Sequence, residues 1–467
     1  MRPARLFNSW ATLLAITSAT LLAVTVLGPF GDPVRSAVVV PTAAAAAETG
    51  GNRVTPGDFT GYGFDQCLAP DQNKMNAWLQ HSPFLAVGIY ISGDSRACRS
   101  QPNLTPKWIA TQLRKGWKLL PITLGPQASC QPRFPRYQDD YKINPTPGDG
   151  NRYRIARRMG RAEAEKTVRA AKALGIASGS TLWYDLEGFD ASNRHCRESA
   201  LSFLSTWTGR LHRLGFVSGV YSSAGSGIKA LDDARVNRPG AFRLPDRIWI
   251  ARWDGVANTS TSYIREDGWR PGGRVKQYQG GHDEVWGGVR INIDRNYLDL
   301  GRGSVAAPEN HCDGVNINFK QYEPLHPPAD GTTSPAAKVR ALRCLLKEKG
   351  LFSGKMAGTY GPKVVEAVRA WHTKLGLPAS DSWSRRDWMT IHTHGRRPVL
   401  KFGSSGGYVR RVQRALNTAN TANRLPISGV YDARTTTAVR NYQAKRKLPV
   451  SGVTNRITWK QLKAGKF

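Results

Sequence analysis

The sequence predicts an α/β protein, with a (β/α)8 TIM-like barrel followed by two small three-helix modules. Eight short β-rich runs, most of them separated by helical patterns, occupy about 240 residues, which fits eight strand-helix units. Further along, a helical pattern occurs twice at an offset of 70 to 71 residues. A doubly wound sheet is the competing arrangement for the first part, but such sheets usually contain fewer strands.

Residues 1–47 have the pattern of an export signal. Arg2 and Arg5 precede an apolar run from Trp10 to Leu27, and an alanine-rich stretch with cleavage options follows at 42–47. An uncleaved signal anchor is the alternative, because the apolar run of 18 residues is at the short limit of a membrane span. We expect a cleaved signal peptide, a secreted protein and no stable membrane insertion after cleavage.

The chain is strongly basic, and the excess charge is regional. Its 467 residues hold 67 Lys plus Arg against 34 Asp plus Glu, a formal charge of +33, and 40% hydrophobic residues, which excludes wholesale disorder. Residues 331–467 contain 27 basic and 5 acidic residues, so this region alone carries +22. The partner is therefore expected to be a polyanion or an anionic surface. Charge alone supports nucleic acid as the partner, and the export signal argues against it.

The barrel is expected over residues 58–302. Helical patterns are clearest at Arg157–Leu174 and Arg197–Leu214, and each is followed by a glycine, a common helix stop. The expected strands are Gly61–Cys67, Leu85–Gly93, Lys118–Pro126, Thr181–Gly188, Val217–Ala224, Arg247–Gly255, Val275–Gly281 and Ile291–Leu298.

A linker at 303–335 precedes the two modules, because its end is rich in Pro, Gly, Thr and Ser. The repeats are expected at 336–395 and 396–467. Each has a first helix, a glycine-tyrosine loop, a second helix, a Leu-Pro turn and a short last helix with Trp. The alignment pairs Val339–Leu346 with Val409–Leu416, Tyr360 with Tyr431, Trp371 with Tyr442, and Trp388 with Trp459.

The six cysteines are expected to form disulfides, because the compartment is oxidising and no C-x-x-C spacing occurs. Six cysteines allow about fifteen pairings. The strand order narrows them, since the first four cysteines follow the first four strands and lie at one face of the barrel. The expected pairs are Cys67 with Cys98, Cys130 with Cys196, and Cys312 with Cys344.

Acidic residues follow several strands at the end where barrel enzymes carry their catalytic groups. Asp65 ends the first strand, Asp185 and Glu187 end the fourth, and Asp294 lies in the eighth. Because strand side chains alternate, Asp185 and Glu187 project to the same face. Glycoside hydrolysis needs one protonated and one ionised carboxyl group. A like charge beside Glu187 would raise its pKa, while Asp185 or Asp294 stays ionised.

Aromatic and amide side chains accompany these acids. Tyr90, Tyr221 and Trp253 offer flat faces for sugar rings, and Gln277 lies at the end of the seventh strand. The alternative is a barrel that only binds, in which the acids make hydrogen bonds to loops.

Four motifs together resemble a known family: Gly-Phe-Asp at 63–65, Tyr-Asp-x-Glu at 184–187, Gly-Val-Tyr-Ser-Ser at 219–223 and Gln-Tyr at 277–278. They look like the glycoside-hydrolase-like barrel of secreted Gram-positive proteins, which is related to the muramidases of glycoside hydrolase family 25. The resemblance spans Gly61 to Leu300. It implies that Asp65, Asp185, Glu187 and Asp294 form the site, with Glu187 as general acid.

The repeats resemble the peptidoglycan-binding domain attached to many wall hydrolases. The second copy keeps the Val-x-x-Leu-Gln-x-x-Leu and Gly-x-Tyr-Asp patterns well, with Val412 at the first Leu position, which implies that Gln413, Tyr431 and Asp432 bind peptidoglycan. The first copy has Arg343 in place of the glutamine and Gly361 in place of the aspartate, so a spacer role is its alternative.

We therefore expect a secreted, wall-associated glycoside hydrolase of muramidase type, anchored by its C-terminal modules. The alternative is a non-catalytic wall-binding protein that uses the barrel as a carbohydrate-binding surface. The expected partners are peptidoglycan and anionic cell-wall polymers, and the expected oligomeric state is a monomer. No cofactor or metal is expected, because the only H-x-H, His392 and His394, lacks the H-E-x-x-H pattern of a zinc site.

Overall fold

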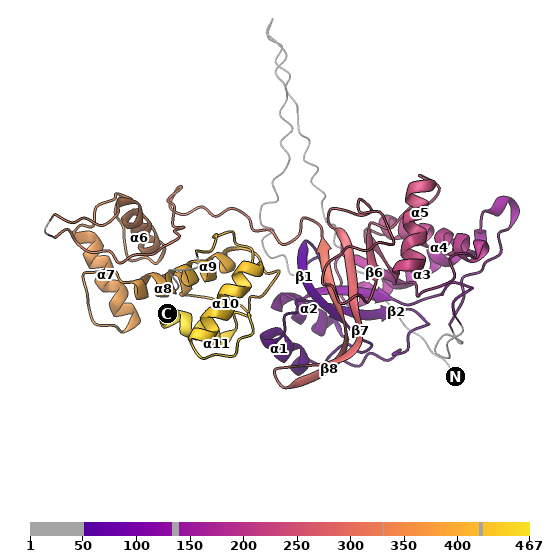
Figure 1. The fold of residues 1–467 in the computed structure, drawn as a ribbon, viewed down its shortest axis with the longest axis horizontal. Helices are drawn as coiled ribbons and strands as arrows, with labels where there is room; N and C mark the ends of the chain where they lie inside the picture. Colours follow the sequence, from indigo (N-terminus) through magenta and orange to yellow (C-terminus); the bar gives the residue numbers. More distant parts are fainter. Residues whose placement is uncertain (1–50, 133–139, 330, 420–423) are drawn as a thin grey trace, which may run out of the picture. The chain divides into compact units, whose positions relative to one another are not determined.

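The computed structural model describes residues 51–132, 140–329, 331–419 and 424–467. The expected signal peptide lies outside the described residues. Eight strands form a closed barrel in the order β1 to β8, and the helices α1 to α5 lie outside it (Figure 1). The predicted α/β barrel is confirmed. The strands are β1 (Phe59–Asp65), β2 (Ala86–Ser92), β3 (Lys118–Thr123), β4 (Thr181–Asp185), β5 (Val217–Ser223), β6 (Arg247–Ala251), β7 (Gly273–Trp286) and β8 (Val289–Leu300).

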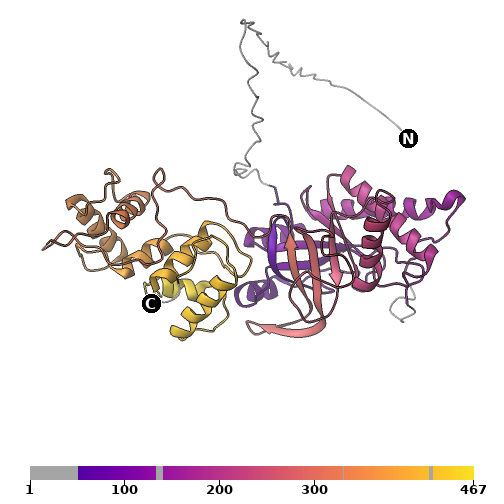
Figure 2. The same ribbon diagram turned by 45° about the horizontal axis from the view of Figure 1, so that its top comes forward.

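The barrel is not entirely parallel, which differs from a strict (β/α)8 repeat. Strands β1 to β7 pair in parallel, whereas β8 is antiparallel to both β7 and β1. Only Gly287 and Gly288 connect β7 to β8, with φ of 62° and 77°. Two glycines in this conformation favour a tight hairpin, and they leave no room for a crossover helix. The hairpin formed by these long strands extends beyond the shorter ones (Figure 2).

Five α-helices follow the first five strands. The two helices that the sequence indicated most clearly are α3 and α4, and Gly175 and Gly215, which follow them, have φ of 73° and 80°. Glycine adopts this left-handed conformation without a steric penalty and so ends both helices. The helices are α1 (Gln72–His81), α2 (Pro106–Lys115), α3 (Arg154–Ala173), α4 (Arg194–Arg213) and α5 (Lys229–Asn237), with a short 3₁₀ helix η2 (Asp149–Asn151) and a short π-helix η3 (Ala224–Ile228).

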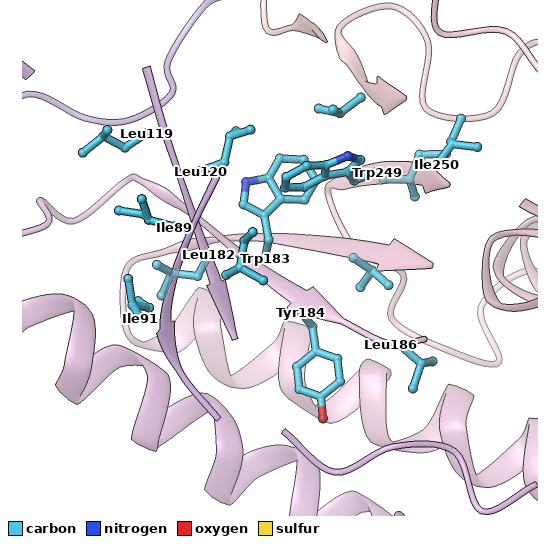
Figure 3. Packing of buried hydrophobic residues seen from close by; sticks show 14 of the residues in the cluster. Ile89, Ile91, Leu119, Leu120, Leu182, Trp183, Tyr184, Leu186, Trp249 and Ile250 are labelled. Atoms are coloured by element: carbon cyan, nitrogen blue, oxygen red, sulfur yellow. The ribbon is translucent and has the colours of Figure 1, made fainter. Parts of the chain in front are cut away.

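Side chains of β4 alternate between the barrel interior and the surrounding helices. Trp183 lies beside Trp249 inside the barrel, whereas Tyr184 points away from this pair (Figure 3). Tyr184 packs against Phe203 and Trp207 of α4. Gly219 makes room for the indole, since a Cβ there would lie 2.3 Å from Trp183. The alternation places Asp185 on the interior side, at the open end of the barrel.

Two three-helix modules follow the barrel, as predicted. The core of the first also contains Ile317, Tyr322 and Leu325, which lie in the segment predicted as a linker. The second has a core of its own. The first consists of α6 (Ala336–Glu348), α7 (Pro362–Leu375) and α8 (Arg385–Thr393), and the second of α9 (Gly407–Ala419), α10 (Ala433–Lys445) and α11 (Arg456–Lys463).

Covalent links stabilise the loops above the barrel and the start of the first repeat. A disulfide restricts the unfolded chain, and in terms of chain entropy the resulting stabilisation of the fold is roughly 3 to 4 kcal/mol for loops of this size. The structure contains the three expected disulfides, Cys67–Cys98, Cys130–Cys196 and Cys312–Cys344.

Among the residues described, no helix combines the length and apolar composition needed to cross a bilayer.

Lys401, at the start of the second repeat, inserts its side chain at the end of α1. Its Nζ donates to the carbonyl oxygens of Trp78, Ser82 and Phe84 at 3.3, 2.7 and 3.0 Å. The lysine is only 1% exposed. A cation is favourable here because the last carbonyls of a helix carry partial negative charge. The second repeat is thereby attached to the barrel.

Candidate active site

The four predicted acids converge on one cavity of about 620 Å³ at the open end of the barrel. Asp65 ends β1, and Asp294 faces it across the antiparallel pair of β1 and β8. Asp185 ends β4, and Glu187 follows two residues later. Because Asp65 and Asp185 end their strands and Asp294 is paired with Asp65, the barrel backbone determines the positions of these carboxyl groups. The cavity is also lined by the four predicted binding residues Tyr90, Tyr221, Trp253 and Gln277.

Asp65 is buried in a network of amide donors. Asn296 Nδ2 donates to Asp65 Oδ1 at 2.6 Å, and Gln277 Nε2 lies 3.3 Å from both carboxylate oxygens. Burial raises the pKa of Asp65 well above its usual value, and the charge of Asp294 raises it further, while the two amides oppose the shift. Asp65 therefore holds a proton more readily than an exposed aspartate.

The side chain of Gln127 holds the backbone of Asp185 and Glu187 through two hydrogen bonds. Gln127 Nε2 donates to the Asp185 carbonyl at 2.8 Å, and its Oε1 accepts from the Glu187 N–H at 2.9 Å. The Tyr90 hydroxyl donates to Asp185 Oδ2 at 3.0 Å. Burial, followed by the charge of Asp185, raises the pKa of the Tyr90 phenol well above its usual value. Tyr90 thus remains a hydrogen-bond donor to this carboxylate.

Gln277 links the aromatic residues to the acids. Its Oε1 accepts from the Tyr221 hydroxyl at 3.0 Å and from Trp253 Nε1 at 2.9 Å. With its Oε1 so engaged, its Nε2 is directed to Asp65. Trp253 is 66% exposed even though its indole nitrogen is fixed. It offers an oriented flat face to a sugar ring, the role expected for it.

Two arginines also line the cavity, which the sequence reasoning did not anticipate. Arg96 and Arg99 lie on the loop after β2, which the Cys67–Cys98 disulfide ties to the loop after β1. Arg96 Nε donates to the Gly93 carbonyl at 2.8 Å. Within the described part of the chain, neither guanidinium forms an ion pair. Positive charge is therefore available at the acid-lined cavity.

Two segments of the chain match known protein families. Residues 76–298 match the family "Rv2525c-like, glycoside hydrolase-like domain", and residues 405–462 match the family "Putative peptidoglycan binding domain". The barrel is a glycoside hydrolase-like domain of the Rv2525c type. The first match includes Asp185, Glu187 and Asp294, and the second lies in the second repeat.

Several solved structures are similar to about half of this chain at low sequence identity. The Tat-secreted protein Rv2525c of Mycobacterium tuberculosis is 14% identical, with 52% of this chain and 98% of that chain covered and a TM-score of 0.34. An uncharacterized protein of B. stearothermophilus is 18% identical, with 51% and 95% covered and a TM-score of 0.30. The autolysin LytC of Streptococcus pneumoniae is 12% identical, with 51% and 46% covered and a TM-score of 0.32. No curated protein matches the chain.

Besides the two arginines, the sequence reasoning missed two further site residues of the barrel, Asn296 and Gln127. Asn296 connects Asp65 to the barrel interior, since its Oδ1 accepts from Trp249 Nε1 at 2.7 Å. It lies two residues after Asp294 in a strand, so alternation could have indicated it. Gln127 lies four residues beyond the end of β3, and no sequence periodicity points to it.

The residues predicted to bind peptidoglycan are engaged inside the second repeat. Gln413 is 1% exposed, and its amide bonds Val430 O and the N–H of Gly429. Tyr431 is 0% exposed, and its hydroxyl donates to Gly452 O at 2.8 Å. Asp432 caps α10 through the N–H of Thr435. The structure therefore shows them positioning the repeat, and direct contact with a ligand stays a prediction.

The described residues contain one group with the composition of a metal site, Cys312, Cys344 and Glu348. The two sulfurs are joined to each other in a disulfide. They therefore cannot act as thiolate ligands in this state.

Proposed function

We propose that the chain is a secreted, wall-associated glycoside hydrolase of muramidase type, which cleaves the glycan strands of peptidoglycan. The observation that carries the proposal is the convergence of four carboxyl groups from β1, β4 and β8 in one cavity beside an oriented tryptophan. Glycosidases use two carboxyl groups of unequal proton affinity. The glycoside hydrolase-like family match and the adjacent peptidoglycan-binding domain support this substrate.

In the proposed mechanism, Glu187 is the general acid that protonates the leaving glycosidic oxygen. Asp185, held by Tyr90, stays ionised and stabilises positive charge at the sugar or activates water. Asp65 and Asp294 complete the cluster, and the raised pKa of Asp65 limits the negative charge that the cavity holds. Trp253 and Tyr221 position the sugar rings.

The test is hydrolysis of purified peptidoglycan, followed by the loss of turbidity. Glu187→Gln should lose nearly all activity, because the amide keeps the shape but cannot donate the proton. The same variant should still pellet with peptidoglycan. Glu165→Gln, which alters a carboxylate ion-paired to Arg210 on the outer helices, is the matched control and should stay active. Undiminished hydrolysis by Glu187→Gln would contradict the assignment, and an inactive wild type that binds peptidoglycan would support a non-catalytic barrel.

A further inference from the structure

A second cavity, of about 710 Å³, lies between residues 395–397, where the second repeat begins, and the last helix, α11. We call it the α11 groove. Five basic residues line it: Arg396, Arg397, Arg456, Lys460 and Lys463. The remaining lining residues are Gly395, Ile457, Trp459 and Gln461, so no acidic side chain of the described residues lines the groove.

Helix α11 supplies three of the five cations on one face. Arg456, Lys460 and Lys463 are spaced four and three residues apart, the spacing at which helical side chains are neighbours. All three are exposed, whereas Trp459 and Leu462 of the same helix are buried. The apolar face therefore anchors α11 and leaves the basic face toward the groove.

The other two cations lie on a segment whose backbone is fixed. The Arg411 guanidinium donates to the carbonyl oxygens of His392, His394 and Arg396 at 2.8, 2.9 and 2.8 Å. Trp459 Nε1 donates to Pro398 O at 2.7 Å, which ties the same segment to α11. Since these contacts use backbone carbonyls, the side chains of Arg396 and Arg397 are left for a ligand. Both are exposed.

The positive charge in the groove is not neutralised by the protein. Within the described residues, none of the five basic side chains forms an ion pair. A fixed concave surface with unpaired cations binds anions more strongly than scattered surface lysines do.

We propose that the α11 groove binds phosphate groups of an anionic cell-wall polymer. Arginine and lysine recognise phosphate oxygens through charge-assisted hydrogen bonds, whereas a neutral glycan would not use five cations. Nucleic acid is disfavoured, because the groove's only aromatic ring, Trp459, is 1% exposed and unavailable for stacking on bases. The inference rests on the wall location in the proposed function, but not on hydrolysis by the barrel.

The test compares two full-length triple variants that each lose three positive charges. The groove variant is Arg456→Gln, Lys460→Gln and Lys463→Gln, and the control is Arg434→Gln, Arg440→Gln and Lys445→Gln on α10. Binding of poly(glycerol phosphate) is measured by calorimetry between 0.1 and 0.5 M salt. The groove variant should bind at least about tenfold more weakly, with a salt slope lower by about two. An equal loss in both variants would overturn the proposal, because net charge alone would then explain binding.

Arg396→Gln with Arg397→Gln is a second variant that leaves α11 unchanged and should also weaken binding. Thermal denaturation verifies that each variant is folded. Two further probes decide the ligand class: peptidoglycan stripped of phosphate polymers, and a single-stranded oligonucleotide of equal charge. Loss of binding to the stripped peptidoglycan in the groove variant would make this a glycan site and refute the proposal. Tighter, groove-dependent binding of the oligonucleotide would also refute it. A barrel without hydrolytic activity changes none of these outcomes.

Discussion

At the scale of single residues, Asp65 shows how the barrel places a carboxyl group where its ionised form is unfavourable. Its carboxyl group is buried, faces Asp294 across the β1–β8 pair, and is bonded by Asn296 and Gln277. Burial and the neighbouring charge raise its pKa, and the amides only partly compensate. Such a group favours the folded state when it is protonated and opposes folding when it is ionised.

Asp65→Asn should therefore raise the melting temperature at neutral pH. The raised folded-state pKa means that the contribution of Asp65 to stability is fully present below about pH 4, the unfolded value, and is lost as pH rises through the folded value. The advantage of the variant should accordingly shrink on acidification. Thermal denaturation from pH 3 to 8 measures it, with the exposed Asp313→Asn as control. A lower melting temperature at pH 7 would show that the ionised form is stabilised instead.

At the scale of elements, the second repeat is built on two equivalent glutamines. Gln413 bonds Val430 O and the N–H of Gly429 within a Ser-Gly-Val turn, and Gln443 bonds Val453 O and the N–H of Gly452 in another. Each turn precedes a helix. In the first repeat, Arg343 and His372 occupy the corresponding positions. Arg343 donates to the carbonyl oxygens of Lys355 and Thr359, so the same kind of loop is held by a cation.

Gln413→Ala should destabilise the second repeat by about 1 to 3 kcal/mol, because buried backbone groups lose their partners. Differential scanning calorimetry of the full chain measures this, with exposed Asn441→Ala on α10 as control. At 10 °C, where the variant should still be folded, pelleting with peptidoglycan should match the wild type. If the folded variant no longer pellets, Gln413 contacts the ligand directly, as the sequence pattern implied.

At the scale of the whole molecule, Lys401 joins the second repeat to the barrel. Burial lowers the pKa of its ammonium group well below the usual value, while three carbonyl acceptors at the end of α1 favour the charged form. An aromatic contact between Tyr62 and Phe402, with ring centroids 5.1 Å apart, supports the attachment. The barrel and the second repeat should therefore unfold together.

Lys401→Met should uncouple the unfolding of the barrel from that of the second repeat. The substitution keeps the side-chain length but leaves the three carbonyl groups without their donor. Calorimetry should then resolve two thermal transitions in place of one coupled transition, with a loss of about 1 to 3 kcal/mol. Lys363→Met, at an exposed position of α7, serves as the control. An unchanged single transition in Lys401→Met would show that the lysine does not couple the parts.

The sequence by itself determined the features that depend on local patterns. Alternation over two residues located the strands and placed Asp185 and Glu187 on one face, and the strand order predicted the disulfides later seen in the structure. Helical periodicity and the internal repeat likewise identified both three-helix modules.

Only the tertiary structure decided the features that depend on contacts between distant segments. The antiparallel β8 closes the barrel, Gln127 reaches the backbone of Asp185 from another loop, and Lys401 inserts at the end of α1. Gln413 and Tyr431 carry the motif of a binding domain but are buried. Sequence spacing describes neighbours along one element, whereas burial and these hydrogen bonds are set by which elements pack together in the folded chain.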